Sequence, residues 1–196
     1  MQQTSDEYQL IRLIQAGNTE AFRRLVDRYS GMLYTLVYRI LQNREETEEV
    51  VQDSFLKAYR NLDRFEFRSG FATWIHRIAY NTAISRTRKK KTEWLPADQF
   101  IIDNHSEDDI FENLFSLNED EKEKMVEWIF NQCNDEEKGL LNMYYISDLN
   151  IKQIAEITGL SESNVKIRLF RIRKRLAALL NEKSEQQLQN ILDYDA

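Results

Sequence analysis

Glycine and proline are scarce in this chain, and this scarcity limits the available folds more than any other feature. The 196 residues include 5 glycines and 1 proline, about 3% of the chain, whereas average usage is about 12%. Tight hairpin turns and β-bulges depend on these two residues. The sequence therefore argues against a many-stranded sandwich or barrel, a collagen-like repeat and glycine/proline-rich disorder.

Apolar residues recur at steps of three and four along most of the chain, which places them on one face of an α-helix. Residues 18–41 follow this pattern, and Asn18 is a suitable N-cap for that helix. Residues 45–62 and 70–89 repeat it, and the acidic side chains of 45–49 suit the positive end of a helix dipole. We therefore predict an all-α fold.

The net charge of −6 argues weakly against a nucleic-acid partner, but it hides an uneven distribution. Residues 1–91 carry 16 basic and 11 acidic side chains, residues 92–135 carry 2 and 13, and residues 136–196 carry 9 of each. Pro96 interrupts any helix at the start of the acidic block. We predict two small helical domains, 1–91 and 119–182, joined by an acidic linker, 92–118, and followed by a tail, 183–196, with a short extra helix.

Two clusters of cations lie on either side of the acidic block. Residues 86–91 contain five cations, and residues 166–175 contain six cations and no acid. One basic run alone is as compatible with a solvated helix face as with a binding site. Two such runs favour a partner with two separated nucleic-acid segments.

Residues 150–165 have the pattern of a helix-turn-helix. Ala155 is small where two helices would cross, Gly159 can adopt the positive φ of a sharp turn, and Ser161 is a good N-cap for the second helix. Val165 would pack back on the first helix. Upstream, Asn134 and Glu137 form a capping-box pair that opens a helix predicted to pack behind this motif. That helix would carry Leu140, Leu141, Tyr144 and Tyr145.

The second helix of this motif has one apolar stripe and two mixed stripes. Val165, Leu169, Ile172, Leu176 and Leu179 form the stripe that we predict to be buried. Lys166, Phe170 and Arg173 form one exposed stripe, and Ile167, Arg171 and Lys174 form the other. In a major groove, such apolar groups can contact thymine methyls while the cations reach guanine edges or phosphates. The alternative is a structural helix with a basic face.

Residues 45–91 contain three further features that fit a binding surface. Leu56 lies among polar residues, which fits a partner contact or an ordinary exposed leucine. The loop 63–70 alternates aromatic residues with arginines, and it could hold an unstacked base or be pinned by two buried phenylalanines. In the next helix, Phe71, Ile75, Ile78 and Thr82 form the predicted core stripe. Trp74, Arg77, Asn81, Ile84 and Arg88 form a separate stripe suited to stacking on a base and gripping phosphates, although Trp74 could also belong to the core.

No catalytic residue, metal site or cofactor is predicted. Cys133 is the single cysteine, and with two histidines it cannot complete a structural zinc site. His76 and His105 are isolated, and we expect surface or packing roles for both. The polar N-terminus and the lack of long apolar windows predict a non-enzymatic, cytoplasmic protein without membrane insertion.

In their order and spacing, these motifs resemble bacterial RNA polymerase sigma factors of the extracytoplasmic-function (ECF) group in the sigma-70 family. The resemblance covers about residues 8–180. In the first domain it rests on Ala21-Phe22…Leu25…Tyr29, Glu48 through Tyr59 and Phe71 through Asn81. In the second it rests on Ile154-Ala155-Glu156…Gly159-Leu160-Ser161…Asn164-Val165-Lys166…Arg168 through Arg173.

The resemblance implies specific contacts for each part of the chain. The clamp of the largest core polymerase subunit would be bound by Gln52, Asp53 and Leu56. The −10 promoter element would be recognised and melted by Phe65, Arg68, Trp74, Arg77, Asn81 and Arg88. The −35 element would be read by Asn164, Lys166, Ile167, Phe170 and Arg171. The acidic linker would run towards the RNA exit path, and an anti-sigma factor is a common partner in the group.

One position departs from the resemblance, because Ser85 stands where many relatives carry an acid. A helix-turn-helix transcriptional regulator with a sensing or dimerising N-terminal domain is the alternative function. It explains residues 136–196 equally well, but it gives no role to the basic and aromatic surface of residues 63–91.

Overall fold

The structure is a computed structural model that describes residues 2–90 and 119–192, with side chains described for 6–88 and 123–180. The described residues form helices and connecting turns and contain no β-strand. The predicted linker 92–118 lies outside the described residues. The helices are α1 (Gln2–Gln15), α2 (Thr19–Leu41), α3 (Arg44–Asn61), η1 (Leu62–Arg64), α4 (Phe71–Lys90), α6 (Glu119–Asn131), α7 (Asp135–Leu141), η2 (Asn142–Ile146), α8 (Ile151–Thr158) and α9 (Glu162–Leu192).

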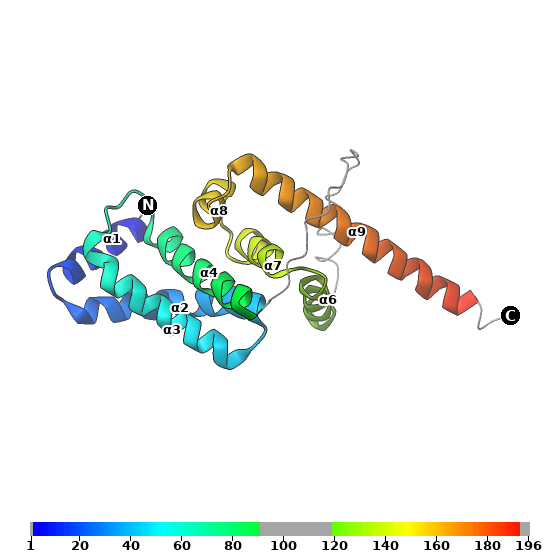
Figure 1. The fold of residues 1–196 in the computed structure, drawn as a ribbon, viewed down its shortest axis with the longest axis horizontal. Helices are drawn as coiled ribbons and strands as arrows, with labels where there is room; N and C mark the ends of the chain where they lie inside the picture. Colours follow the sequence, from blue (N-terminus) through cyan, green and yellow to red (C-terminus); the bar gives the residue numbers. More distant parts are fainter. Residues whose placement is uncertain (1, 91–118, 193–196) are drawn as a thin grey trace.

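Helices α1 to α4, which we call the N-terminal bundle, assemble around α2 (Figure 1). The predicted N-cap is confirmed, because the Asn18 side chain accepts a hydrogen bond from the Ala21 N–H. At the other end of α2, Gln42 adopts φ 51°, which lets the chain reverse into α3 within two residues. Leu25, Leu33 and Leu36 are fully buried and supply the centre of this bundle.

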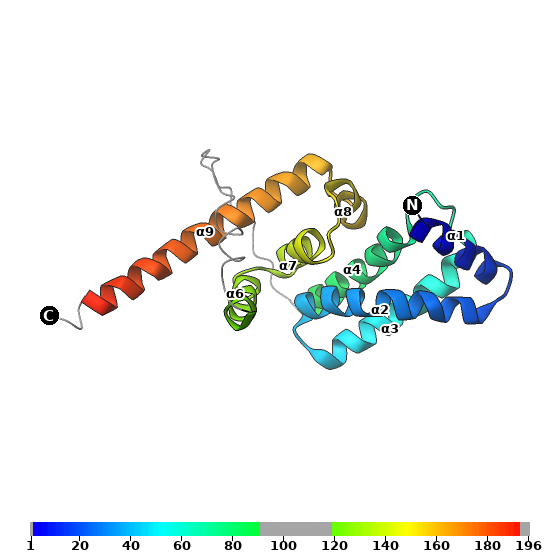
Figure 2. The same ribbon diagram turned by 180° about the vertical axis from the view of Figure 1, so that it is seen from behind.

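Helices α6 to α9 form the C-terminal bundle, in which α9 is a single helix of 31 residues. The sequence predicted a separate short helix in the tail, but the described part of that tail continues α9 to Leu192. Figures 1 and 2 show the C-terminal half of α9 projecting away from the rest of the molecule.

The helix predicted to open at Asn134 is shorter than expected. The capping box between Asn134 and Glu137 is confirmed, but α7 ends at Leu141 and a π-helical segment follows. In that segment the Ser147 N–H bonds to the Asn142 carbonyl, five residues back. The wider turn moves Tyr144 and Tyr145 out of α7, and Tyr145 is exposed.

The two bundles pack directly against each other. Helix α4 lies beside α8 and α7, and α2 lies beside α7 and η2. Figure 1 shows α4 next to α7 and α8. Helix α4 has a second buried stripe, made of Thr73, His76, Tyr80 and Ile84, in addition to its core residues. Two residues of this stripe meet the C-terminal bundle: Thr73 at Gln153 and Tyr80 at Gly139. Ile84, which the sequence pattern puts on a separate stripe with Trp74 and Asn81, is 7% exposed.

Candidate nucleic-acid interface

The turn between α8 and α9 has the geometry predicted for a helix-turn-helix. Gly159 adopts φ 75°, a conformation that costs a residue with a side chain about 1–2 kcal/mol. Ser161 Oγ accepts a hydrogen bond from the Asn164 N–H at 3.2 Å, which confirms Ser161 as the cap of α9. Val165 is fully buried and Ala155 is 8% exposed, so the two helices meet where the sequence indicated.

Helix α9 presents a mixed cationic and apolar surface. Lys166 and Arg171 are exposed, and Ile167 is 41% exposed among them. No acidic side chain of the described residues forms an ion pair with Lys166 or Arg171. Phe170 and Arg173 are half-buried, so the stripe predicted to be fully exposed is partly covered.

Asn164 differs in its role from the other predicted −35 residues. Its Oδ1 atom accepts a hydrogen bond from Arg168 Nε at 3.1 Å, one turn further along α9. The Asn164 side chain is half-buried. In this structure Asn164 therefore orients Arg168, while Lys166 and Arg171 remain available to a partner.

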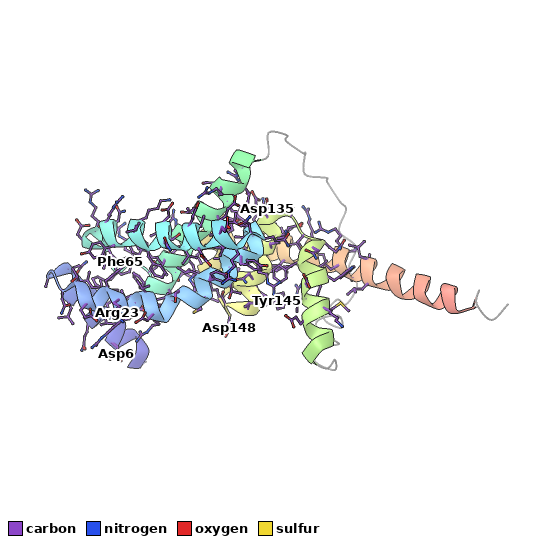
Figure 3. All side chains as sticks on the ribbon, turned by 90° about the horizontal axis from the view of Figure 1, so that it is seen from below. Asp6, Arg23, Phe65, Asp135, Tyr145 and Asp148 are labelled. Atoms are coloured by element: carbon purple, nitrogen blue, oxygen red, sulfur yellow. The ribbon has the colours of Figure 1, made fainter. Side chains whose placement is uncertain are left out.

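The loop before α4 presents its aromatic side chains unequally. Phe65 is 7% exposed, and its ring lies 5.0 Å from both Phe67 and Trp74 (Figure 3 labels Phe65). Trp74 is half-buried against Phe65 and Phe71. The buried-phenylalanine interpretation therefore holds for Phe65, and the half-buried Phe67 and Trp74 lie nearer the surface.

Two arginines and an amide are exposed on α4 and on the loop that carry these aromatic residues. Arg77 and Asn81 are exposed on α4, and Arg68 is exposed on the loop, where it pairs with Glu66 at 2.7 Å. The structure thus places Arg77 and Asn81 on one side of α4, one turn apart, as the sequence predicted.

Sequence reasoning missed three α1 residues that fix the loop. Gln15 Nε2 donates to the carbonyl oxygens of Leu62 and Phe65, at 2.9 and 3.4 Å. The Tyr8 ring stacks on Phe67 at 4.9 Å, and the Arg12 guanidinium lies 5.7 Å from the same ring. Phe67 has φ 57°, an uncommon conformation for a bulky residue. No local pattern predicts these contacts, because they join residues about 50 positions apart.

Helix α3 carries the residues predicted to contact polymerase. Gln52, Asp53 and Leu56 are exposed, and Leu56 is 52% exposed. Asp53 and Asn81 line one open groove of about 590 Å³ between α3 and α4. The groove's other lining residues are Lys57, Ile78, Thr82, Ser85 and Arg86. The predicted polymerase and −10 contacts are thus continuous on one surface.

Several other arginines form ion pairs with acidic side chains. Arg86 pairs with Glu49 on α3 at 2.8 Å. Arg88 of α4 and Arg168 of α9 each approach a different oxygen of Glu136, both at 3.0 Å. One carboxylate of α7 therefore joins the end of α4 to the start of α9.

Several buried titratable side chains have pKa values shifted by their surroundings. Burial and the Glu7 carboxylate raise the pKa of Tyr29, and burial raises the pKa of Cys133 to about 11. Both groups are therefore protonated at neutral pH. Within residues 6–88 and 123–180, no three His, Cys, Asp or Glu side chains are placed to hold a metal ion. No described helix is both long and apolar enough to cross a membrane.

His76 is a packing residue rather than a surface residue. It is fully buried, its Nδ1 atom lies 2.7 Å from the Ala72 carbonyl oxygen, and its Nε2 atom has no hydrogen-bond partner. Burial lowers the pKa of His76, and the Ala72 carbonyl opposes this effect. The folded protein therefore holds a neutral imidazole.

This imidazole predicts a loss of stability in acid. The unfolded chain binds a proton at His76 near pH 6.5, whereas the folded chain does so at lower pH, so the free energy of unfolding falls as the pH drops below about 6.5. The loss from one proton is at most about 1.4 kcal/mol per pH unit. Between pH 7.5 and pH 5.5, the fall in unfolding temperature should be smaller in His76→Gln than in wild type. An equal loss of stability in wild type and in His76→Gln would contradict the assignment of this pH effect to His76.

Comparison with known proteins identifies the family. The sigma-70 region 2 family model matches residues 25–93, and the sigma-70 region 4 model matches residues 135–176. Two relatives are each 31% identical to this chain. One is the ECF RNA polymerase sigma factor SigW of Bacillus subtilis, matched over 88% of this chain and 95% of SigW. The other is the RNA polymerase sigma-H factor of Pseudomonas aeruginosa, matched over 90% of this chain and 96% of that protein.

Solved structures share the fold. CnrH, in complex with the cytosolic domain of CnrY, matches with a TM-score of 0.60 at 21% identity, over 90% of this chain and 98% of that one. RpoE of Bartonella quintana, in complex with the anti-sigma factor NepR, matches with a TM-score of 0.58 at 19% identity, over 83% and 98%. With region 2 and region 4 in one chain and 31% identity over nearly all of SigW, this chain belongs to the ECF group of sigma-70 family RNA polymerase sigma factors.

Proposed function

We propose that this chain binds core RNA polymerase and directs promoter-specific initiation by reading −35 DNA and melting −10 DNA. One observation carries the proposal: each of the two family regions coincides with an exposed surface of cations and apolar groups. Region 4 contains Arg171 and Ile167, and region 2 contains Arg77 and the half-buried Trp74. A protein with two such surfaces can hold two segments of one DNA molecule.

The proposed −35 contact is the major groove, entered by the start of α9. Lys166, Ile167, Phe170 and Arg171 would face the base edges, and Asn164 would act by holding Arg168. Exposed cations reach guanine or phosphate oxygens, and the exposed isoleucine suits a thymine methyl.

The loop 63–70 and helix α4 together form the proposed contact with −10 DNA. Arg68, Arg77, Asn81 and Arg88 would hold the DNA backbone and bases, and Trp74 would stack on an unpaired base. Phe65 would support the loop from beneath, because its own ring is covered. Energy for melting would come from these contacts, so we propose no catalysed reaction and no cofactor.

The proposed polymerase contact is the α3 surface of Gln52, Asp53 and Leu56. This proposal is supported by the groove that Asp53 and Asn81 both line, because it puts the proposed polymerase contact next to the proposed −10 contact. Bound polymerase would then lie beside the DNA that is being melted. Residues 1–91 would form the unit for polymerase and −10 DNA, and residues 119–182 the unit for −35 DNA. Work at core polymerase places the protein in the cytoplasm, and an anti-sigma factor, as bound by RpoE of Bartonella quintana, is a further proposed partner.

Run-off transcription with purified core polymerase and a promoter library tests the proposal. We expect promoter-specific transcripts that require the protein, and co-elution of the protein with core polymerase. A helix-turn-helix regulator would instead bind duplex DNA by itself and require another sigma factor for transcription. Absence of both initiation and core binding would refute the sigma function for this chain.

A further inference from the structure

We propose that Gln15, together with Tyr8 and Arg12, fixes the shape in which the loop 63–70 receives an unpaired base of the −10 element. All three residues lie on α1, a helix that carries none of the proposed DNA or polymerase contacts. The inference rests on the proposed function and deepens it, because it names residues that act on DNA through the loop. They are positioning residues, and their removal should weaken the capture of single-stranded −10 DNA.

The loop has little backbone structure of its own. At its entry the Phe65 N–H donates to the Leu62 carbonyl oxygen, and at its exit the Trp74 N–H donates to the Gly70 carbonyl oxygen, both at 3.1 Å. Between these points, no hydrogen bond between backbone atoms joins residues 66–69 to another described residue. Segments with few internal contacts open locally at low free energy. The shape of this loop therefore depends on side chains that reach it from outside.

Gln15 holds the start of the loop. Its Nε2 atom donates to the carbonyl oxygens of Leu62 and Phe65, at 2.9 and 3.4 Å. One side-chain amide thus connects the first residue of η1 to the residue that follows η1. The ring of Phe65 lies 5.0 Å from the ring of Trp74, the side chain proposed to stack on a base. The position of Gln15 is therefore passed to Trp74 through Phe65.

Tyr8 and Arg12 hold the middle of the loop. Phe67 has φ 57°, and an uncommon backbone conformation persists only where its surroundings favour it strongly. The Tyr8 ring stacks on the Phe67 ring at 4.9 Å with 19° between the ring planes. The Arg12 guanidinium lies 5.7 Å from the centre of the same ring, and the Phe65 ring lies 5.0 Å from it. These contacts favour the observed turn at Phe67.

Helix α1 is itself anchored to the rest of the N-terminal bundle. Ile11 is 1% exposed and Ile14 is 8% exposed, so one face of α1 lies in the core. The buried Glu7 carboxylate accepts a hydrogen bond from the Tyr29 hydroxyl of α2. The Tyr29 ring lies 5.4 Å from the ring of Phe71, the first residue of α4. Helix α1 can therefore serve as a fixed support for a loop that leads into α4.

A supported loop binds DNA at lower cost than a mobile one. Ordering a mobile segment on binding subtracts from the affinity, and a segment that is already ordered avoids this loss. Helix α1 packs mainly against α2 and η1, so changes on its loop-facing side should leave the α3 surface and α9 unaffected. We therefore expect these residues to affect −10 binding and to have no effect on polymerase binding or −35 discrimination.

Limited trypsin digestion of the free full chain tests the support directly, because Arg64 and Arg68 are exposed cleavage sites in the loop. Gln15→Glu removes the donor at nearly constant size, and Gln9→Glu makes the same change at an exposed position of the same helix. When opening is fast, cleavage follows the population of the open form. Gln15→Glu should be cut after Arg64 or Arg68 about 10-fold faster, the value of one to two hydrogen bonds. Gln9→Glu should be cut at the wild-type rate.

Two uncharged changes at Tyr8 exclude an effect of charge on the protease. Tyr8→Ala removes the ring that stacks on Phe67, and we expect cleavage in the loop to rise about 2- to 10-fold. Tyr8→Phe keeps the ring, so cleavage should stay at the wild-type rate. Equal rates in wild type, Gln15→Glu and Tyr8→Ala would overturn the proposal.

A DNA-binding measurement then asks whether the support matters for capture of the strand. Holoenzyme made from each protein is titrated with a labelled single strand that carries the −10 element of a promoter found by run-off transcription. Gln15→Glu should bind this strand about 10-fold more weakly, while its core affinity and its −35 discrimination stay at the wild-type level. Equal losses in all three measurements would indicate a general folding defect and would overturn the positioning role. Weaker strand binding with wild-type cleavage would also overturn it, since the new charge would then act on DNA directly.

The same measurements separate this inference from the proposed function. If wild type neither binds core polymerase nor initiates transcription, the sigma function is refuted, and faster cleavage of Gln15→Glu still supports α1 as the support of the loop. If wild type initiates and Gln15→Glu binds the −10 strand equally well, the positioning role alone is refuted.

Discussion

Replacing Arg171 by alanine is expected to weaken −35 recognition by about 5- to 150-fold, or ~1–3 kcal/mol, the value of a guanidinium that reads a base edge. Arg171 is exposed on α9, and no acidic side chain of the described residues forms an ion pair with it. The measurement is equilibrium binding of the reconstituted holoenzyme to a promoter and to the same promoter with a scrambled −35 element. Wild type should discriminate between them, and Arg171→Ala should lose most of that discrimination.

Arg175 supplies the matched control one turn further along α9. It donates to both carboxylate oxygens of Glu137, at 2.9 and 2.7 Å, and this contact raises the pKa of Arg175. Arg175→Ala should cost at most about 1 kcal/mol of stability, because the pair is partly exposed, and should leave −35 discrimination unchanged. Equal loss of discrimination in both variants would indicate a general effect of charge and would reject base reading by Arg171.

Features set by neighbouring residues were predictable from the sequence. The caps at Asn18, Asn134 and Ser161 and the positive φ of Gly159 follow from local chemistry, and the structure contains all of them. The buried stripe of α9 also follows from helical spacing, since Val165 and the other apolar residues up to Leu176 are buried. Leu179 is half-buried because the helix runs beyond the body of the bundle.

Features set by distant contacts were not predictable in the same way. Thr73 and Tyr80 of α4 are buried next to a second bundle, since Thr73 contacts Gln153 and Tyr80 lies against Gly139, some 60 to 80 residues away in sequence. Phe67 keeps its unusual φ beside Tyr8 and Arg12 of α1. Helical periodicity shows that a face is apolar or mixed, but it does not show which element will cover it.

The candidate site shows the same division. Exposure of Arg77, Asn81, Lys166 and Arg171 follows from their helical positions, and the structure agrees. The ion pairs of Arg88 and Arg168 with Glu136 do not follow from helical position, because they depend on how the two bundles meet. The cations that remain exposed are therefore the stronger candidates for DNA contacts, and the paired ones are the stronger candidates for holding the bundles together.

Replacing Leu56 by glutamate is expected to weaken binding of core polymerase by about 30-fold or more. Leu56 is 52% exposed beside Gln52 and Asp53, so an added charge should leave the fold intact. An unpaired charge enclosed in an interface costs about 2–5 kcal/mol. The measurement is a titration of labelled protein with core polymerase, with helical content checked by circular dichroism.

Leu13→Glu is the control, because Leu13 is a 47% exposed leucine on α1, away from α3. It introduces the same charge at similar exposure, and we expect polymerase affinity within about twofold of wild type, since the change lies outside the proposed interface. If both variants weaken binding equally, the added negative charge acts through long-range electrostatics and not through a contact at Leu56. If neither does, Leu56 is an ordinary exposed leucine, and the polymerase surface lies elsewhere on the N-terminal bundle.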